Sequence, residues 1–315
     1  MEKRSYTQVL SIDGTQLRLD DKPFYFQGLS FFNALYNPTF NASLQDRRRW
    51  LVKFRDNGIN VLRVWCQWDF NPPRTFVDVK PDTTMYTSDG AIIDTHFERL
   101  AELLLAADGL DMVIEVVAFS HEKTPGEENL PVPLQEWAIQ ALTQRLKPYR
   151  NLILQIWNED STNVIRHYEL IKQEDPDRIV GNSPGFANNL GDDTQNRLMD
   201  VLMPHTVRGS YDKFWEEAPR QITGLLRTYR KPVIDDEPAR CGLIQFGGIQ
   251  GGTLPEQHIA QIKAVRAAGG YHTYHHDMFQ RSYGASTTPP NGLPDPDFSP
   301  FHRQVFDYLR DHPTW

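Results

Sequence analysis

Short apolar runs rich in β-branched and aromatic residues alternate with segments of helical periodicity along nearly the whole chain. Apolar runs of this kind are typical of parallel strands buried on both faces, and the alternation is typical of βα units. The eight runs expected to form strands are 22–30, 59–65, 111–120, 151–157, 178–184, 200–206, 231–237 and 270–276. The segments expected to form helices are 43–58, 94–109, 133–149, 161–175, 217–230, 255–270 and 301–312. This pattern predicts an α/β fold of the (β/α)8 TIM-barrel type.

We expect residues 1–315 to form a single domain, with a short N-terminal β-hairpin in 1–21 and the barrel in 22–315. The main competing architecture, a doubly wound open sheet, more often carries a glycine-rich phosphate-binding turn after its first strand. The stretch FQGLSFFN after the first run is not such a turn. Two helix ends are also predicted, with Asp94 as an N-cap and Gly58 as a C-terminal cap.

The chain of 315 residues has a formal net charge of −8, which argues against a nucleic-acid partner, because phosphates are bound by clustered Lys and Arg. It has no apolar run of about 18 residues, so no membrane span is expected. The start MEKRSYTQVL lacks the apolar region of a signal peptide. The compartment stays open between the cytoplasm and export with a removed signal, as does the oligomeric state. We expect Cys66 and Cys241 to be buried free thiols.

The residues that follow each apolar run decide the function, because the active site of such a barrel forms at the carboxyl ends of its strands. Here these positions collect carboxylates, imidazoles and indoles, whereas an ordinary surface holds mostly Lys and Glu. The residues at or just beyond the strand ends are Ser30, Phe31, Phe32, Asn33, Arg63, Trp65, Gln67, Trp68, Asp69, Ser120, His121, Glu122, Asn158, Glu159, His205, Asp235, Asp236, Glu237, Tyr274, His275, His276 and Asp277.

The stretch NLILQIWNED places Glu159 directly after a buried run, although an ionised carboxylate is costly to bury without a partner. Glu237 ends the seventh run, three βα units later, so the two glutamates are expected to face each other across the barrel. Glycoside cleavage needs such a pair, one carboxyl protonated to donate to the leaving oxygen and one ionised to attack the anomeric carbon. Arg63 near Glu237 would favour its ionised form.

Five pieces of the chain, in this order, resemble the clan of retaining (β/α)8 glycosidases that includes glycoside hydrolase family 5, the cellulase and β-mannanase family. GTQLRLDDKPFYFQGLSFFN is similar to the opening segment of the clan, and LVKFRDNGINVLRVW to its second βα unit with the arginine. ILQIWNE resembles the Asn-Glu motif that ends strand four. DVLMPH is similar to strand six with its histidine, and KPVIDDE to the nucleophile segment of strand seven.

The resemblance implies a hydrolase of O-glycosidic bonds that acts on a carbohydrate by double displacement, with no cofactor and no metal. It implies that Glu159 is the general acid/base and Glu237 the nucleophile. The residues that it places around the substrate are Asn158 at the sugar 2-hydroxyl, Arg63 beside Glu237, His121 and His205 along subsite −1, and Tyr211 as a further hydrogen-bond partner of Glu237.

The end of strand eight departs from the clan, which usually places a Trp there as a sugar platform. Tyr274, His275 and His276 occupy this stretch instead, and they replace stacking area by hydrogen-bonding capacity. We therefore expect Tyr274 and His275 to bind substrate, with narrow specificity for a short or decorated glycoside rather than for long cellulose or mannan. The glycine-rich residues 247–252 are expected to act as a lid.

Several aromatic and acidic residues near the strand ends have both a binding and a packing interpretation. Trp65 and Trp68 suit stacking on a pyranose ring, but packing in the protein core is an equal alternative for each of them. For Trp157 as well, core packing and a role in the site are equally compatible with the sequence. Asp235 and Asp236 alternate along a strand, so only one of them is expected to face the barrel interior next to Glu237.

Two other classes of function stay open from the residues. One is a metal-dependent barrel hydrolase, although its first strand lacks the His-x-His pair that such enzymes commonly use. Its candidate ligands are His121, His205, His272, His275, His276 and Asp277. The other is a barrel that binds carbohydrate without cleaving it. The presence of both Glu159 and Glu237 favours the hydrolase over either alternative.

Overall fold

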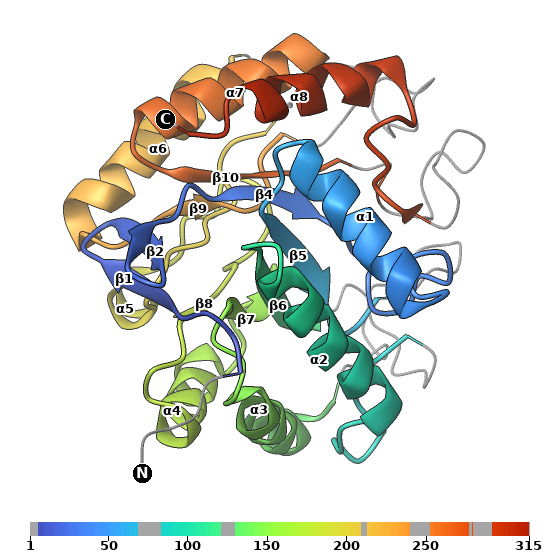
Figure 1. Cartoon of the computed structure of the whole chain (residues 1–315). Coiled ribbons are helices and arrows are strands. Elements are labelled where there is room, and N and C mark those ends of the chain that lie inside the picture. The colour runs from blue at the N-terminus through green and yellow to red at the C-terminus, as the bar shows by residue number, and fades with distance from the viewer. Residues whose placement is uncertain are drawn as a thin grey trace.

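The computed structural model of this protein describes residues 6–68, 83–120, 130–208, 213–239, 253–276, 279 and 292–314. Within these ranges, seven parallel strands form one curled sheet near the centre of Figure 1. The strands are β4 (Gln27–Ser30), β5 (Val61–Trp65), β6 (Val113–Ser120), β7 (Leu152–Asn158), β8 (Val180–Gly181), β9 (Ile234–Asp235) and β10 (Tyr271–Tyr274). Their spatial order is β8-β7-β6-β5-β4-β10-β9, the circular order of a (β/α)8 barrel. The predicted fold class is confirmed.

Segment 200–203 fills the gap between β8 and β9 and closes the sheet. The Asp200 backbone N–H donates to Val180 O at 2.9 Å on one side. On the other side, the Leu202 N–H donates to Pro232 O at 2.9 Å and Ile234 N–H donates to Leu202 O at 2.8 Å. The predicted strand over 200–206 is therefore reduced to a single parallel bridge, because Pro204 has no N–H to continue the ladder.

Helices follow the strands and surround the sheet (Figure 1). They are α1 (Leu44–Asp56), α2 (Asp94–Asp108), α3 (Val132–Leu146), α4 (Val164–Glu174), α5 (Asp193–Leu198), α6 (Phe214–Tyr229), α7 (Pro255–Ala267) and α8 (Pro300–Asp311). Gly58 follows α1 with a left-handed φ of +86°, in line with the predicted cap. The prediction for Asp94 is wrong: it lies inside the first turn of α2, where its carboxylate forms an ion pair with Arg145 at 2.5 Å.

The N-terminal hairpin covers the end of the barrel where the strands begin. It consists of β1 (Leu10–Asp13) and β2 (Gln16–Leu19), antiparallel, with β3 (Lys22–Pro23) beside β2. Its apolar side chains join those at the strand starts in one buried cluster: Leu10, Leu17, Leu19, Phe24, Phe26, Val61, Val113, Ile153, Ile179, Val201, Met203, Ile234 and Tyr271. The predicted strand over 22–30 is thus divided into β3 and β4, because Phe24 and Phe26 between them pack into this cluster.

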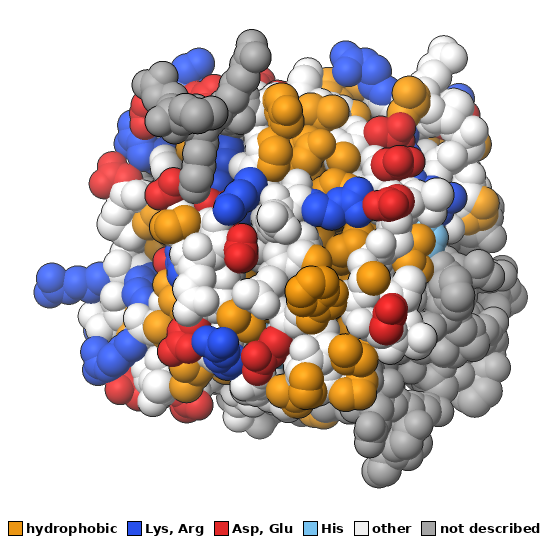
Figure 2. Space-filling model, turned by 90° about the horizontal axis from the view of Figure 1, so that it is seen from below, with side chains coloured by type: hydrophobic (Ala, Val, Ile, Leu, Met, Phe, Trp, Pro, Cys, Tyr) orange, Lys and Arg blue, Asp and Glu red, His pale blue; other side chains and the backbone are white. Residues whose placement is uncertain are grey.

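The outer surface is mixed in character. Apolar and charged side chains lie side by side on the face shown in Figure 2, which is ordinary because much of a folded protein's surface is apolar. None of the described helices is long and apolar enough to cross a membrane. Cys66 is a buried free thiol, as predicted, and Cys241 lies outside the described residues.

Candidate active site

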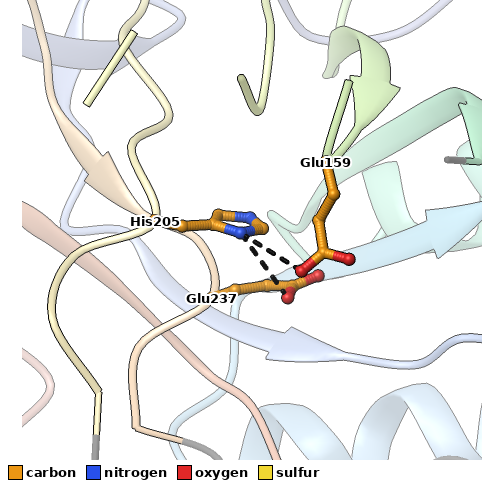
Figure 3. A group of neighbouring side chains, drawn as sticks. All are labelled: Glu159, His205 and Glu237. Carbon is orange, nitrogen blue, oxygen red and sulfur yellow. Dashed lines mark ion pairs between the residues drawn. The ribbon is translucent and has the colours of Figure 1, made fainter. Parts of the chain in front are cut away.

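The two glutamates meet at the carboxyl end of the barrel. Glu159 directly follows β7 and Glu237 lies two residues beyond β9, and their side chains converge with that of His205 (Figure 3). One ligand atom from each of the three residues lies within 4.8 Å of the other two. Glu159 is 4% exposed and Glu237 2% exposed. The sequence therefore brings two carboxylates from distant chain segments into one buried site.

Glu159 has a φ of +64°, in the left-handed region that a residue with a side chain rarely adopts. Two hydrogen bonds fix the backbone of the next residue: the Asp160 N–H donates to Ser183 O at 3.2 Å, and Asn182 Nδ2 donates to Asp160 O at 2.9 Å. Unfavourable backbone conformations persist where the surrounding structure enforces them, and they are frequent at functional sites. This conformation sets the direction in which the Glu159 side chain leaves the strand.

Arg63 on β5 organises the base of the site. Its Nη1 donates to Glu237 Oε1 at 2.9 Å, and its Nη2 donates to Asn158 Oδ1 at 2.7 Å. Its Nε donates to Gln155 Oε1 at 3.0 Å, and the guanidinium is fully buried. Arg63 thus links the ends of β5, β7 and β9 and presents a positive charge to Glu237, as the sequence predicts.

Three buried carboxylates share this one guanidinium. Arg63 forms ion pairs at 3.0 Å with Glu115 and with Asp236, in addition to that with Glu237. Burial raises the pKa of Glu115 and of Asp236 to about 7 in each case, against the charge of Arg63. One cation cannot fully balance three desolvated anions, so burial favours the protonated form of Glu115 and Asp236, whereas the lowered pKa of Glu237 favours its ionised form.

Several neighbouring groups lower the pKa of Glu237. Burial raises the pKa of Glu237, but His205, His275, Arg63 and Arg208 outweigh it and hold the pKa well below its usual range. At Glu159, burial and the charge of Glu237 raise the pKa, and His205 together with Arg208 lowers it below its usual range. The neighbouring groups therefore favour the ionised form of both carboxylates.

Arg208 is the second cation of the site. Its Nη2 donates to Glu237 Oε2 at 3.0 Å, to Glu159 Oε1 at 3.4 Å and to His205 Nδ1 at 2.8 Å. A guanidinium can only donate, so this last contact is a hydrogen bond when His205 Nδ1 is unprotonated. Whenever His205 is neutral, Arg208 supplies the positive charge between the two glutamates. Arg208 is absent from the sequence-based candidates, because it lies in a loop three residues beyond His205 with no periodicity to place it.

His205 is held from its other side. Ser183 Oγ hydrogen-bonds His205 Nε2, and Asp236 Oδ1 lies 3.5 Å from the same nitrogen. Asp236 therefore faces the barrel interior. Asp235 faces the other way, where Thr206 Oγ1 and Gln261 Nε2 of α7 donate to it at 2.9 and 3.1 Å. The expectation that only one of the two aspartates lies next to Glu237 agrees with these contacts.

Aromatic rings and His275 form a wall beside Glu237. Phe32 stacks on Trp65 with ring centroids 4.4 Å apart, and it lies 4.4 Å from the Trp68 ring and 5.2 Å from His275. The Arg63 guanidinium lies 4.5 Å above the Trp65 ring. His275 Nε2 lies 3.8 Å from Glu237 Oε2. The packing interpretation of Trp65 and Trp68 gains support, because both are nearly fully buried and Phe32 packs against both rings.

Tyr274 packs away from the glutamates. Its hydroxyl hydrogen-bonds His302 Nδ1 of α8 at 2.6 Å, and its ring lies 5.5 Å from those of His258 on α7 and Phe306 on α8. This packing corrects the expectation that Tyr274 lines the substrate site. The physical reason is strand alternation: His275 points to Glu237, so the preceding side chain points to the surrounding helices.

The remaining tryptophan and histidine candidates are also placed by packing. Trp157 Nε1 donates to Thr162 O at 2.8 Å, and its ring lies 5.0 Å from Phe119 and 6.1 Å from His167 of α4. His276 packs against His302, with ring centroids 4.6 Å apart. Among the described residues, the group with metal-binding geometry is Glu159, His205 and Glu237, which includes none of the strand-eight histidines.

Other sequence-predicted residues cannot be placed. His121 and Tyr211 lie outside the described residues, as do Asp69, Glu122, Asp277 and the glycine-rich segment 247–252. The site that the structure does bring together contains Arg63, Asn158, Glu159, His205, Glu237 and His275 from the prediction, with Trp65 and Trp68 in its wall.

Comparisons with known proteins agree on the fold. The sequence matches no protein-family model, and no curated protein sequence is similar to it. A glycoside hydrolase family 5 structure from Bacteroides vulgatus ATCC 8482 aligns with 93% of this chain and 69% of its own, at 18% identity and a TM-score of 0.67. A β-glucanase from Saccharophagus degradans aligns over 99% and 96%, at 14% identity and a TM-score of 0.65. A family 5 mannosidase from Rhizomucor miehei aligns over 96% and 97%, at 13% identity and a TM-score of 0.65.

Proposed function

We propose that this protein is a retaining glycoside hydrolase. The observation that carries the proposal is the pair Glu159 and Glu237, two buried carboxylates from opposite strands of the barrel with oxygens within 4.8 Å of each other. Retaining glycosidases place their carboxyl groups about 5 to 5.5 Å apart, whereas inverting enzymes leave about 6.5 to 9.5 Å for a water. An oxygen of Glu159 within 4.8 Å of an oxygen of Glu237 is compatible with the shorter, retaining separation.

The surroundings suggest which carboxylate takes which role. The pKa of each glutamate is lowered in this structure, but Arg63 donates to Glu237 and, among its contacts with described residues, not to Glu159, so Glu237 suits the nucleophile. In the first step, Glu237 attacks the anomeric carbon while Glu159 gives its proton to the departing oxygen, which leaves as an alcohol. In the second step, Glu159 takes a proton from water, and the resulting hydroxide displaces Glu237 from the sugar.

Asn158 and the histidines would bind the sugar. Asn158 Oδ1 accepts a hydrogen bond from Arg63. The amide N–H groups of Asn158 can therefore donate to a sugar hydroxyl such as that on C2. Ser30 Oγ hydrogen-bonds His275 Nδ1 at 2.9 Å, which orients the ring beside Glu237. His121 and Tyr211 stay proposed members of the site on the strength of the sequence resemblance alone.

The structural neighbours support the same class. A β-glucanase and a mannosidase share this fold, and their names refer to different sugars. The neighbours therefore favour glycoside cleavage without indicating the sugar. The replacement of the strand-eight platform by His275 supports a narrow specificity, because buried donors and acceptors reject ligands that leave them unpaired.

A metal-dependent reaction is the competing candidate, because Glu159, His205 and Glu237 could together hold a cation. The Arg208 guanidinium, however, already donates to all three of these residues. A divalent ion at this point would have to displace a buried positive charge, so the geometry favours catalysis by the two carboxylates themselves.

Hydrolysis of a panel of aryl glycosides tests the proposal. We expect the purified protein to release the phenol from at least one glycoside, with unchanged rates after dialysis against a chelator. Glu237→Gln is the control, since it retains the shape of the side chain and removes the nucleophile. Activity that disappears with the metal, or that survives in Glu237→Gln, would contradict the assignment.

A further inference from the structure

Arg208 occupies the position that a reacting sugar needs. In a near-attack arrangement, the anomeric carbon lies about 3 to 3.5 Å from the attacking oxygen. Arg208 Nη2 lies 3.0 Å from Glu237 Oε2 and 3.4 Å from Glu159 Oε1, and therefore between the two carboxylates. A sugar that enters the proposed subsite −1 must displace this guanidinium.

Arg208 also opposes the acid role of Glu159. A general acid must carry a proton before the reaction, and a neighbouring guanidinium favours the ionised form. Arg208 contributes to the low pKa of Glu159 in this structure. Burial and the negative charge of Glu237 raise this pKa, whereas His205 and then Arg208 lower it. Displacement of Arg208 removes one of these two opposing groups and so moves Glu159 toward the protonated form that the acid role needs.

The displaced guanidinium needs an anion. Arg208 is only 7% exposed, and among the described residues its Nε has no hydrogen-bond partner. The other buried carboxylates that the structure describes nearby are engaged: Asp236 and Glu115 pair with Arg63, and Asp235 is bonded to groups on the other side of its strand. The described residues therefore offer Arg208 no ready alternative to the two glutamates, and a buried cation without a partner is costly.

We infer that the substrate supplies this anion: the sugar in subsite −1 carries a negatively charged substituent, a carboxylate or a sulfate, that binds the displaced Arg208. The inference rests on the proposed glycosidase function and specifies its substrate class. Guanidinium groups bind carboxylate and other oxyanions through two parallel hydrogen bonds, and Arg208 has its unpartnered Nε available for one of them. A neutral sugar would have to displace the same cation without binding it.

Matched pairs of 4-nitrophenyl glycosides test the inference. Each pair has one sugar configuration and one leaving group, and differs only in a carboxylate or a hydroxymethyl group at C5, as in glucuronide and glucoside or galacturonide and galactoside. A third member with a 6-sulfate distinguishes the two anions. We expect kcat/KM for the best acidic member to exceed that of its neutral partner by about 100-fold or more.

Arg208→Gln should remove this preference, whatever it does to the overall rate, and Arg220→Gln on the exposed face of α6 is the matched control. Equal or better cleavage of the neutral members, or a preference that survives in Arg208→Gln, overturns the inference but leaves the glycosidase proposal intact. If no glycoside is cleaved, the glycosidase proposal fails, and calorimetric titration with free glucuronate, galacturonate and glucose 6-sulfate decides the inference. Binding that is lost in Arg208→Gln supports it, and absence of binding overturns it.

Discussion

The two ends of the barrel are built from the same strands but from opposite kinds of side chain. At the end where the strands begin, the hairpin β1–β2 packs Leu10, Leu17 and Leu19 against apolar strand residues such as Val61 and Val113. At the end where the strands finish, Arg63 and Arg208 are buried together with four carboxylates, those of Glu115, Glu159, Asp236 and Glu237. At the hairpin end, burial of apolar side chains stabilises the fold. At the carboxyl end, burial of charged side chains costs free energy because they lose their hydration.

This contrast shows how one sheet can separate stability from chemistry. Val61 and Arg63 lie two residues apart on β5, yet Val61 belongs to the apolar cluster and Arg63 to the charged site. Apolar burial at one end offsets the cost of desolvating charges at the other. Substitutions at the two ends should therefore affect different quantities, the stability at one end and the rate at the other.

The largest effect is expected at Glu237. Glu237→Ala removes the proposed nucleophile, so kcat should fall by at least about 10⁴-fold with every glycoside that the protein cleaves. Circular dichroism and thermal unfolding should show an intact fold, because Glu115 and Asp236 remain beside Arg63 and can balance its charge. A variant that keeps more than a hundredth of the activity would show that the nucleophile lies elsewhere.

Glu159 should give a smaller effect that depends on the leaving group. Glu159→Ala should slow cleavage of a glycoside with a poor leaving group by about 10²- to 10⁴-fold, because protonation of the oxygen is lost. With 2,4-dinitrophenolate, which leaves without a proton, the first step should be almost unaffected in pre-steady-state measurements. Equal losses with both leaving groups would remove Glu159 from the acid role.

Leu17 tests the opposite end of the barrel. Leu17→Ala should lower the free energy of unfolding by about 2 to 5 kcal/mol, since Leu17 is 1% exposed within the apolar cluster. Under conditions where the variant is folded, kcat should stay within about twofold of the wild type. The exposed Leu105→Ala on α2 is the control for stability. A large loss of kcat in folded Leu17→Ala would mean that the two ends are not separate.

Glu115→Gln should give the smallest effect, a change in how the free energy of unfolding depends on pH. Burial raises the pKa of Glu115 to about 7 in the folded protein, above the value of about 4.3 expected in the unfolded chain. A raised pKa contributes stability that is complete below about pH 4 and is lost as the pH rises through 7. Glu115→Gln cannot ionise, so it should gain roughly 1 to 3 kcal/mol relative to the wild type between pH 5 and pH 8.

Urea unfolding at both pH values measures this gain, and Glu169→Gln on the surface of α4 serves as the matched control. A stability difference between Glu115→Gln and the wild type that is the same at pH 5 and pH 8 would show that Glu115 is ionised in the folded protein throughout this range.

Much of the fold could be predicted because it depends on periodicity. The order of apolar runs and helical segments is enough to indicate the barrel and to place Glu159 and Glu237 at its mouth. Strand lengths could not be predicted in the same way. Pro204 shortens the sixth strand to one bridge, and the aromatic residues Phe24 and Phe26 leave the ladder to join the apolar cluster.

The site was predictable where side chains belong to strands and less so in loops. Strand alternation alone could have separated His275 from Tyr274, since neighbours on a strand point to opposite faces. Arg208 offered no such signal. Its position depends on the path of the loop after His205 and on the electrostatic attraction of two buried glutamates, and both require the three-dimensional arrangement.

Trapping of the covalent intermediate tests the central claim most directly. A 2-deoxy-2-fluoro derivative of the best-cleaved sugar, with a 2,4-dinitrophenyl leaving group, slows the second step more than the first and lets a glycosyl-enzyme accumulate. Mass spectrometry of the digested protein should then find one sugar adduct, on the peptide that contains Glu237, and none in Glu237→Gln. A sugar adduct on Glu159, or continued cleavage of the unmodified sugar with inversion at the anomeric carbon and no adduct, would contradict this account.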